Sequence, residues 1–267
     1  MPCIKVNGAR LYYEQHGTGP ETIVFAHGLL MSGRMFDPQV DALKDRYRCI
    51  TLDFRGQGQS EVTPGGYDMD TLTGDAAGLI RELGCAPCHF VGLSMGGFVG
   101  MRLAIHSPDL IKSLMLLETT ADPEPRENVG RYRRMNFVAR WFSLSLVAAP
   151  VMKILFGRKF LNDPSRAGFR ADLRRRILSN HRVGISHAVL GVITRQGVYD
   201  QLDQIRVPTL IVVGDQDVAT GPAKAERIHA RIHGSTLRII PGAGHSSSIE
   251  EPEAVIAVIV EFLRDLH

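Results

Sequence analysis

Short runs of apolar residues, each four or five residues long, recur along most of the chain. They occupy residues 22–26, 49–52, 90–93, 114–117, 210–213 and 237–240, after a pair of apolar segments at 4–6 and 11–13. The opening pair is joined by Asn7-Gly8, a dipeptide that favours the positive φ angles of a hairpin turn. The later runs are typical of strands buried on both faces, as in a parallel sheet covered by helices.

Helical patterns lie between several of these runs. They cover residues 71–83, 96–106 and 252–266. The first ends at Gly84, and the last places Pro252 in its first turn and Glu253 near the positive end of its dipole. This alternation of strand and helix predicts an α/β fold with a doubly wound, mostly parallel sheet of about eight strands.

The alternation breaks between residues 122 and 200. Four helical patterns follow one another there without an intervening strand, at 130–142, 144–156, 166–179 and 186–194. This segment holds fifteen Arg or Lys and six Asp or Glu, a balance of +9 in a chain whose net charge is only +3. We therefore expect a core formed by 1–121 and 201–267, with 122–200 inserted between two core strands as a helical lid.

Composition narrows the functional classes. Of the 267 residues, 44% are apolar and 22% are charged, which is ordinary for a globular protein. The small net charge argues against nucleic-acid binding, and no apolar run approaches the roughly 18 residues that span a bilayer. The first residues also lack the pattern of a signal peptide. We expect a soluble cytoplasmic protein, with the choice between monomer and homodimer left open.

One serine has a distinctive setting. Ser94 is the centre of Gly92-Leu93-Ser94-Met95-Gly96, which matches G-x-S-x-G and joins an apolar strand to a helical pattern. Such a tight turn holds its central residue at a strained backbone angle, and the glycines let strand and helix approach closely. The helix dipole favours negative charge nearby. A capping serine would be a simpler explanation, but this context indicates a nucleophile.

Several motifs occur in the order and spacing of a known family. They are His27-Gly28, Asp53-Phe54-Arg55-Gly56-Gln57-Gly58-Gln59-Ser60, the Ser94 turn, Val207-Pro208-Thr209-Leu210, Gly214-Asp215-Gln216-Asp217 and Gly242-Ala243-Gly244-His245. With them the chain resembles the α/β-hydrolase family, specifically its small, lidded esterase-like members. The resemblance runs from about residue 22 to the C-terminus and is weakest across the insertion. Gln57 departs from the pattern, because a histidine is usual there.

A serine hydroxyl needs a base, and the base needs an acid that orients it. The resemblance implies the order serine, acid, histidine, which assigns Ser94 as nucleophile, Asp217 as acid and His245 as base. Two other carboxylates compete for the acid: Asp215, which is nearer the strand, and Glu118, since some relatives take the acid from that strand end. A strand-end charge facing solvent would be the structural explanation of Glu118.

The remaining site residues follow from the chemistry of acyl transfer. Backbone N–H groups of Met95 and Leu29 are expected to stabilise the oxyanion, and His27 to hold the loop that carries Leu29. Leu29, Met95 and the lid residues Trp141 and Phe142 are expected to contact substrate in an apolar pocket. The Arg-rich stretches of the lid are interpreted as solvated helix faces, with attraction of an anionic substrate as the alternative.

The resemblance therefore predicts a serine hydrolase that cleaves carboxylic esters, a carboxylesterase-like enzyme needing neither metal nor cofactor. A lactonase similar to enol-lactonases, a carbon–carbon bond hydrolase and a perhydrolase remain alternatives, because the same three side chains serve each of them. A non-catalytic ligand receptor is a further alternative that a complete triad disfavours. The sequence does not define the physiological substrate or its chain length.

Overall fold

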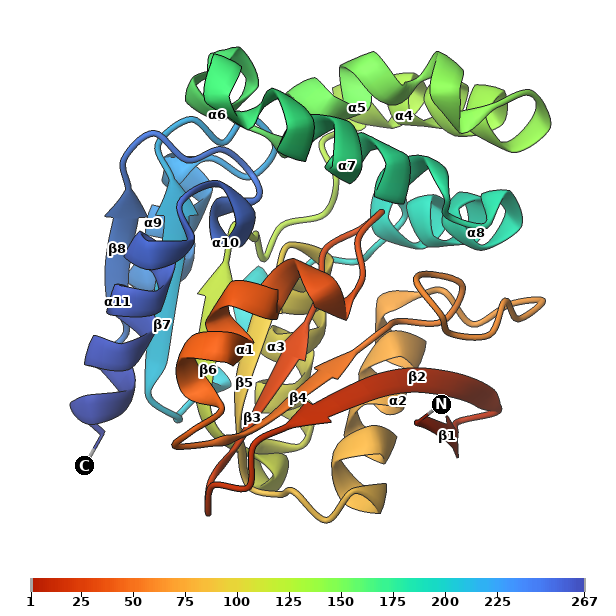
Figure 1. Ribbon diagram of the computed structural model, residues 1–267. Helices are drawn as coiled ribbons and strands as arrows, with labels where there is room; N and C mark the ends of the chain where they lie inside the picture. Colours follow the sequence, from red (N-terminus) through yellow and green to blue (C-terminus); the bar gives the residue numbers. More distant parts are fainter. Residues whose placement is uncertain (1, 267) are drawn as a thin grey trace.

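The computed structural model describes residues 2–266 and contains one eight-stranded sheet. The strands are β1 (Cys3–Val6), β2 (Ala9–His16), β3 (Thr22–Ala26), β4 (Arg48–Leu52), β5 (Cys88–Leu93), β6 (Ile111–Leu117), β7 (Thr209–Gly214) and β8 (Thr236–Ile240). Their order in the sheet is β1-β2-β4-β3-β5-β6-β7-β8, with β1 and β2 antiparallel and the other six parallel (Figure 1). The predicted doubly wound sheet is confirmed.

The central strands are buried on both faces. Every residue of β3, β5 and β7 is buried, which explains why these segments are mainly apolar. The same expectation was wrong for β8, where Ile239 is 48% exposed. This strand lies at the edge of the sheet. Within residues 2–266 it pairs only with β7, so no further strand lies along its other edge.

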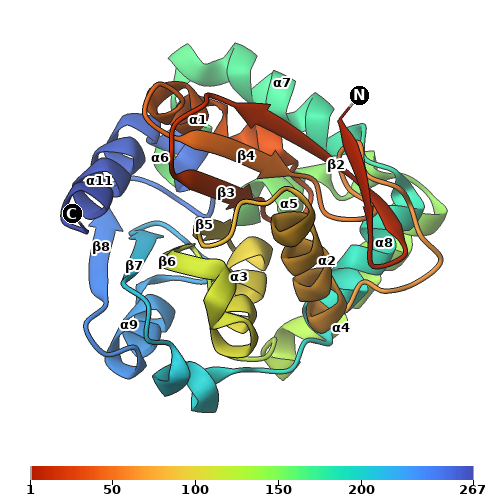
Figure 2. The ribbon, with the colours of Figure 1, turned by 90° about the horizontal axis from the view of Figure 1, so that it is seen from below.

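Helices cover both faces of the sheet. The helices of the core are α1 (Asp37–Leu43), α2 (Met69–Glu82), α3 (Met95–His106), α9 (Pro222–Arg231), α10 (Ser247–Glu250) and α11 (Pro252–Arg264). Helices α2, α3 and α9 lie on one face, whereas α1 and α11 lie on the other (Figure 2). The sequence pattern predicted α2, α3 and α11 but not α1, α9 or α10, which are short or strongly polar on one side.

The chain between β6 and β7 is helical. Its helices are α4 (Arg126–Trp141), α5 (Ala148–Leu155), α6 (Arg158–Asn162), α7 (Ala167–Leu178) and α8 (Arg182–Ile193). They lie above the carboxyl ends of the parallel strands (Figure 1). Where the sequence pattern predicted one helix over 144–156, the chain forms a 3₁₀ turn, Leu144–Leu146, followed by α5. We call the segment 122–200 the lid.

The lid and the core approach each other closely at glycines. A Cβ added to Gly184 of α8 would lie 2.1 Å from the carbonyl oxygen of Gly56, and one added to Gly244 would lie 2.1 Å from the nitrogen of Gly157. The buried carboxylate of Glu250 accepts N–H groups from both sides of the second contact, at 2.7 Å from Gly157 and 3.0 Å from Gly244. These contacts hold the lid directly over the loop that carries His245.

Further short 3₁₀ helices complete the described secondary structure. They are η1 (Gly33–Phe36), η2 (Pro108–Leu110), η4 (Pro164–Arg166) and η5 (Tyr199–Gln204). Within residues 2–266, no helix combines the length and the apolar character needed to cross a membrane.

Candidate active site

Ser94 occupies a strained turn between β5 and α3. Its backbone angles are φ +52° and ψ −107°, a region that residues with a Cβ rarely adopt. The neighbouring glycines make the turn possible: a Cβ on Gly92 would lie 2.3 Å from the oxygen of Gly96, and one on Gly96 would lie 2.0 Å from the oxygen of Ala26. The turn therefore directs the Ser94 side chain away from the sheet at the start of α3.

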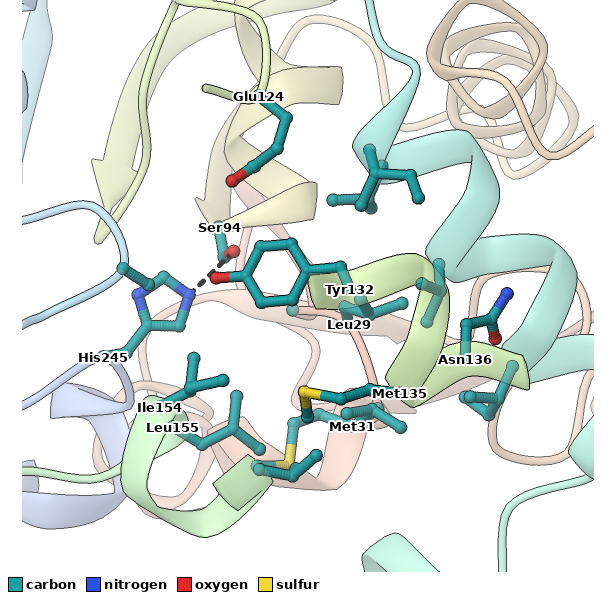
Figure 3. Close-up of a pocket in the computed structure, with 18 of the residues that line it drawn as sticks. Leu29, Met31, Ser94, Glu124, Tyr132, Met135, Asn136, Ile154, Leu155 and His245 are labelled. Carbon is teal, nitrogen blue, oxygen red and sulfur yellow. Dashed lines mark hydrogen bonds between the residues drawn. The ribbon is translucent and has the colours of Figure 1, made fainter. Parts of the chain in front are cut away.

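The three side chains predicted to act together form a chain of two hydrogen bonds through His245. Nε2 of His245 is 2.9 Å from Oγ of Ser94, and Nδ1 of His245 is 3.0 Å from Oδ2 of Asp217. All three are buried, and Figure 3 shows the imidazole of His245 facing Ser94. The loops after β5, β7 and β8 deliver them, because the carboxyl ends of parallel strands meet at one edge of the sheet.

Asp217 is held in its charged form. Burial raises its pKa, but the adjacent His245 and hydrogen bonds from Thr220 outweigh burial and lower the pKa of Asp217 to about 2. Oδ1 accepts the N–H groups of Ala219 and Thr220 at 2.8 and 3.0 Å, and Oδ2 accepts the Thr220 hydroxyl at 2.8 Å. The carboxylate is thus fixed in position and remains able to accept from His245.

Thr220 was not anticipated from the sequence. Its Oγ1 lies 2.8 Å from Asp217 and 3.2 Å from Nδ1 of His245, so it contacts both. The available signal was its position three residues after Asp217, where a hydroxyl can reach back to a carboxylate that begins a turn.

The two rival carboxylates have other environments. Asp215 is exposed, and its Oδ1 accepts the N–H of Gly242 at 2.7 Å, which supports the loop leading to His245. Glu118 is fully buried and adopts φ +42°, so the idea of a strand-end charge facing solvent was wrong. Burial raises the pKa of the Glu118 carboxyl well above its usual value. Glu118 is therefore buried apart from the triad, and Asp217 is the carboxylate that contacts His245.

Two backbone N–H groups belong to segments next to Ser94: Met95 follows it in the chain, and Leu29 lines the same pocket. Within residues 2–266, neither the N–H of Leu29 nor that of Met95 has an intramolecular hydrogen-bond partner. Leu29 lines the same pocket as Ser94, and a Cβ added to the preceding Gly28 would lie 3.5 Å from Cβ of Ser94. Their role as an oxyanion hole remains a prediction that this arrangement accommodates.

The loop that carries Leu29 is fastened by side chains. Nδ1 of His27 lies 2.7 Å from the oxygen of Gly28, and its Nε2 accepts the N–H of Phe54 at 2.9 Å. Because one ring nitrogen accepts, the other donates, and His27 is neutral. Burial disfavours the charged form of the ring and therefore lowers the pKa of His27.

Gln57 also positions this loop. Its Oε1 accepts the N–H of Leu30 at 2.8 Å, and its Nε2 lies 3.8 Å from the sulfur of Met95. Gln57, the residue that departs from the family pattern, therefore connects the segments carrying the two candidate oxyanion donors.

A pocket opens over Ser94 and His245 (Figure 3). Its wall is mainly apolar and comes from the core loop containing Leu29 and from the lid. Apolar lid residues that line it include Met135, Ala139, Leu144, Val147, Ile154 and Leu155. The polar side chains in the wall are fewer, and Tyr132, Asn136, Glu124 and Arg195 are among them.

Three of the expected substrate contacts are corrected by the structure. Trp141 and Phe142 do not line the pocket, because they are 64% and 63% exposed on the outer surface of the lid. Ala139, two residues before Trp141 on α4, faces the pocket instead, which reflects the rotation of about 100° per helical residue. The side chain of Met95 is fully buried and does not line the pocket, whereas Leu29 does.

Comparison with known proteins gives the family. The sequence model of the α/β-hydrolase fold matches residues 21–252, which is most of the chain. This chain belongs to the α/β-hydrolase family. It is therefore a member of a family of hydrolase enzymes, and the predicted α/β-hydrolase fold is confirmed.

Individual relatives of this α/β hydrolase include esterases and lactonases. A solved structure of a thermophilic esterase from Thermogutta terrifontis superposes with a TM-score of 0.93 at 31% identity, covering 100% of both chains. The enol-lactonase from Burkholderia xenovorans superposes with a TM-score of 0.92 at 29% identity, covering 98% of this chain and 100% of that one. 3-Oxoadipate enol-lactonase 1 of Acinetobacter baylyi is 29% identical over 93% of this chain and 91% of its own length.

Proposed function

We propose that this α/β hydrolase is a serine hydrolase that cleaves carboxylic esters through an acyl-enzyme on Ser94. The observation that carries the proposal is the continuous array from Ser94 through His245 to Asp217, with separations of 2.9 and 3.0 Å. A buried serine beside an imidazole whose other nitrogen faces a carboxylate has the arrangement that activates a hydroxyl.

The first half-reaction forms the acyl-enzyme. Oγ of Ser94 attacks the ester carbonyl carbon while Nε2 of His245 takes its proton. Asp217 orients the imidazole and stabilises its cation, and the N–H groups of Leu29 and Met95 bind the oxyanion. The bond to the leaving oxygen then breaks, and His245 gives its proton to the departing alcohol.

The second half-reaction releases the acid. Water attacks the acyl carbonyl carbon and loses a proton to His245, after which the bond to Ser94 breaks and the serine regains its proton. Each step uses this chain's own side chains and water. The apolar wall from the lid supplies the surface for the acyl or alcohol group.

Lactone hydrolysis is the second candidate. The likeness to two enol-lactonases favours it, and a ring ester passes through the same intermediates. A carbon–carbon bond hydrolase acting on a diketone acid would need a polar lid, and the mostly apolar lid surface of this pocket argues against that reaction.

The experiment has two parts. A fluorophosphonate probe is expected to label the wild-type protein and to leave Ser94→Ala unlabelled, since the probe reacts with an activated serine. Turnover of short p-nitrophenyl esters is then compared with turnover of lactones and vinylogous diketones. Equal labelling of Ser94→Ala, or wild-type protein that cleaves no ester or lactone in the panel, would refute the proposal.

A further inference from the structure

An ion pair is built into the wall of the pocket. Nη1 of Arg195 lies 3.0 Å from Oε2 of Glu124, and both residues line the cavity that contains Ser94. Their side chains are only 3% and 11% exposed. Within residues 2–266, Arg195 is the only Arg or Lys that lines this pocket.

The pair lies close to the candidate nucleophile. Phe98 is one helical turn after Ser94 on α3, and its N–H donates to the oxygen of Ser94. The guanidinium carbon of Arg195 is 4.3 Å from the centre of the Phe98 ring, and Phe98 itself lines the pocket. Figure 3 shows the Glu124 carboxyl group directed toward the part of the pocket that holds Ser94. A substituent a few bonds from the reacting carbonyl would therefore encounter the pair.

Neighbouring groups hold the two partners in place. Nε of Arg195 donates to the backbone carbonyl oxygen of Asp122 at 3.2 Å. Its Nη1 also donates to the backbone carbonyl oxygen of Val192, at 2.8 Å. The other carboxylate oxygen of Glu124 accepts from Asn128 at 3.1 Å. The Asp122 carboxylate is engaged with Arg227 at 3.3 Å, so Glu124 is the carboxylate that neutralises Arg195.

This arrangement has a consequence for substrate charge. An unpaired arginine in an apolar pocket would attract a substrate carboxylate and could bind it with two hydrogen bonds. Glu124 already occupies that position, and it would repel a second carboxylate at short range in a poorly solvated site.

We propose that the pocket selects neutral esters or lactones, and that Glu124 is the residue that excludes substrates carrying a carboxylate near the reacting carbonyl. The inference rests on the proposed ester hydrolysis and defines the substrate class of the same site. Arg195 acts as the partner that holds Glu124 in place, and Glu124 determines the specificity.

The test uses two substrates that differ only in charge. They are the p-nitrophenyl ester of glutaric acid with its second carboxyl free, and the same ester with that carboxyl methylated. The ratio of kcat/KM for the acid to that for the methyl ester is measured after subtraction of the uncatalysed rates. Wild-type protein is expected to give a ratio of about 0.1 or less, because Glu124 repels the free carboxylate of the acid in a poorly solvated site.

Substitution of Glu124 is expected to change this preference. In Glu124→Gln the amide keeps the shape of the side chain but leaves Arg195 uncompensated, so the ratio is expected to rise at least about tenfold. Glu127→Gln removes the same charge three residues further along, from an exposed position in the first turn of α4, and it is expected to leave the ratio unchanged. Equal shifts in the two variants would indicate a general charge effect and would overturn the inference.

A second variant covers the case in which Glu124→Gln fails to fold, which circular dichroism would reveal. Arg195→Gln leaves the Glu124 carboxylate unpaired, and the ratio is expected to fall below the wild-type value. A wild-type ratio near or above 1, or a folded Glu124→Gln variant with the wild-type ratio, refutes the inference. If wild-type protein cleaves neither ester nor any lactone, the proposed function itself is refuted, so the two failures are distinguishable.

Discussion

The turn around Ser94 in the core and the outer face of the lid differ in how tightly their backbones constrain the sequence. In the core, a Cβ on Gly96 would lie 2.0 Å from the oxygen of Ala26, so no other residue fits between β3 and α3. In the lid, a Cβ on Gly130 of α4 would meet nothing within 4 Å. The core thus positions the chemistry through close backbone contacts, whereas the lid shapes the pocket with side chains on helices whose outer faces tolerate change.

The largest effect is expected on catalysis, when the negative charge of Asp217 is removed. In Asp217→Asn, the amide cannot stabilise the imidazolium or select its tautomer, so kcat on a short p-nitrophenyl ester is expected to fall by about 10³- to 10⁴-fold. The matched control is Glu118→Gln, which replaces a buried carboxyl by an amide of similar shape and is expected to change kcat by less than about tenfold. A greater loss in Glu118→Gln than in Asp217→Asn would assign the acid to the other strand.

Paired glycine substitutions test the contrast in backbone constraint directly. Gly96→Ala is expected to lower the free energy of unfolding by at least about 3 kcal/mol, because the added carbon overlaps backbone atoms that cannot move independently. Gly130→Ala is expected to raise it by about 0.5–1 kcal/mol, since alanine loses less backbone entropy in an exposed helix. Urea unfolding followed by circular dichroism measures both, and a similar destabilisation in the two variants would contradict the comparison.

The charge of Asp217 also links stability to pH. Its pKa of about 2 in the folded protein lies below the ordinary value of 3.8, so its stabilising contribution is present above pH 3.8. This contribution is lost as pH falls from 3.8 toward 2, and it amounts to about 2 kcal/mol. The free energy of unfolding of wild type and of Asp217→Asn is measured by urea unfolding at several pH values between 5 and 2. The difference between the two proteins at each pH isolates the effect. A difference that does not decrease across this range would argue against the depressed pKa.

The smallest effect is expected on the outer face of the lid. Trp141→Ala is expected to change the free energy of unfolding by no more than about 0.5 kcal/mol, because the indole is 64% exposed. Leu155→Ala is expected to cost about 2 kcal/mol, because that side chain is buried and lines the pocket. Thermal unfolding by circular dichroism compares them, and equal losses would show that the two faces of the lid are not distinct.

Most of the core was predictable because its signals are local. Apolar runs indicated the central strands, and the glycines around Ser94 indicated a tight turn, since each feature depends on residues adjacent in the chain. The order of the motifs, through the family resemblance, also led to Asp217 and His245. The edge position of β8 was missed: its sequence, Thr-Leu-Arg-Ile-Ile, contains the charged Arg238, and Ile239 next to it is exposed.

The sequence by itself determined the alternation of strand and helix, the helical insertion and the residue types available for chemistry, because periodicity and turn residues act over a few positions. Only the tertiary structure decided which side chains meet. It paired Asp217 rather than Glu118 with His245, turned Trp141 and Phe142 outward, and set Glu124 against Arg195 in the pocket wall. These outcomes depend on helix rotation, burial and contacts between residues far apart in the chain, such as the 71 positions that separate Glu124 from Arg195.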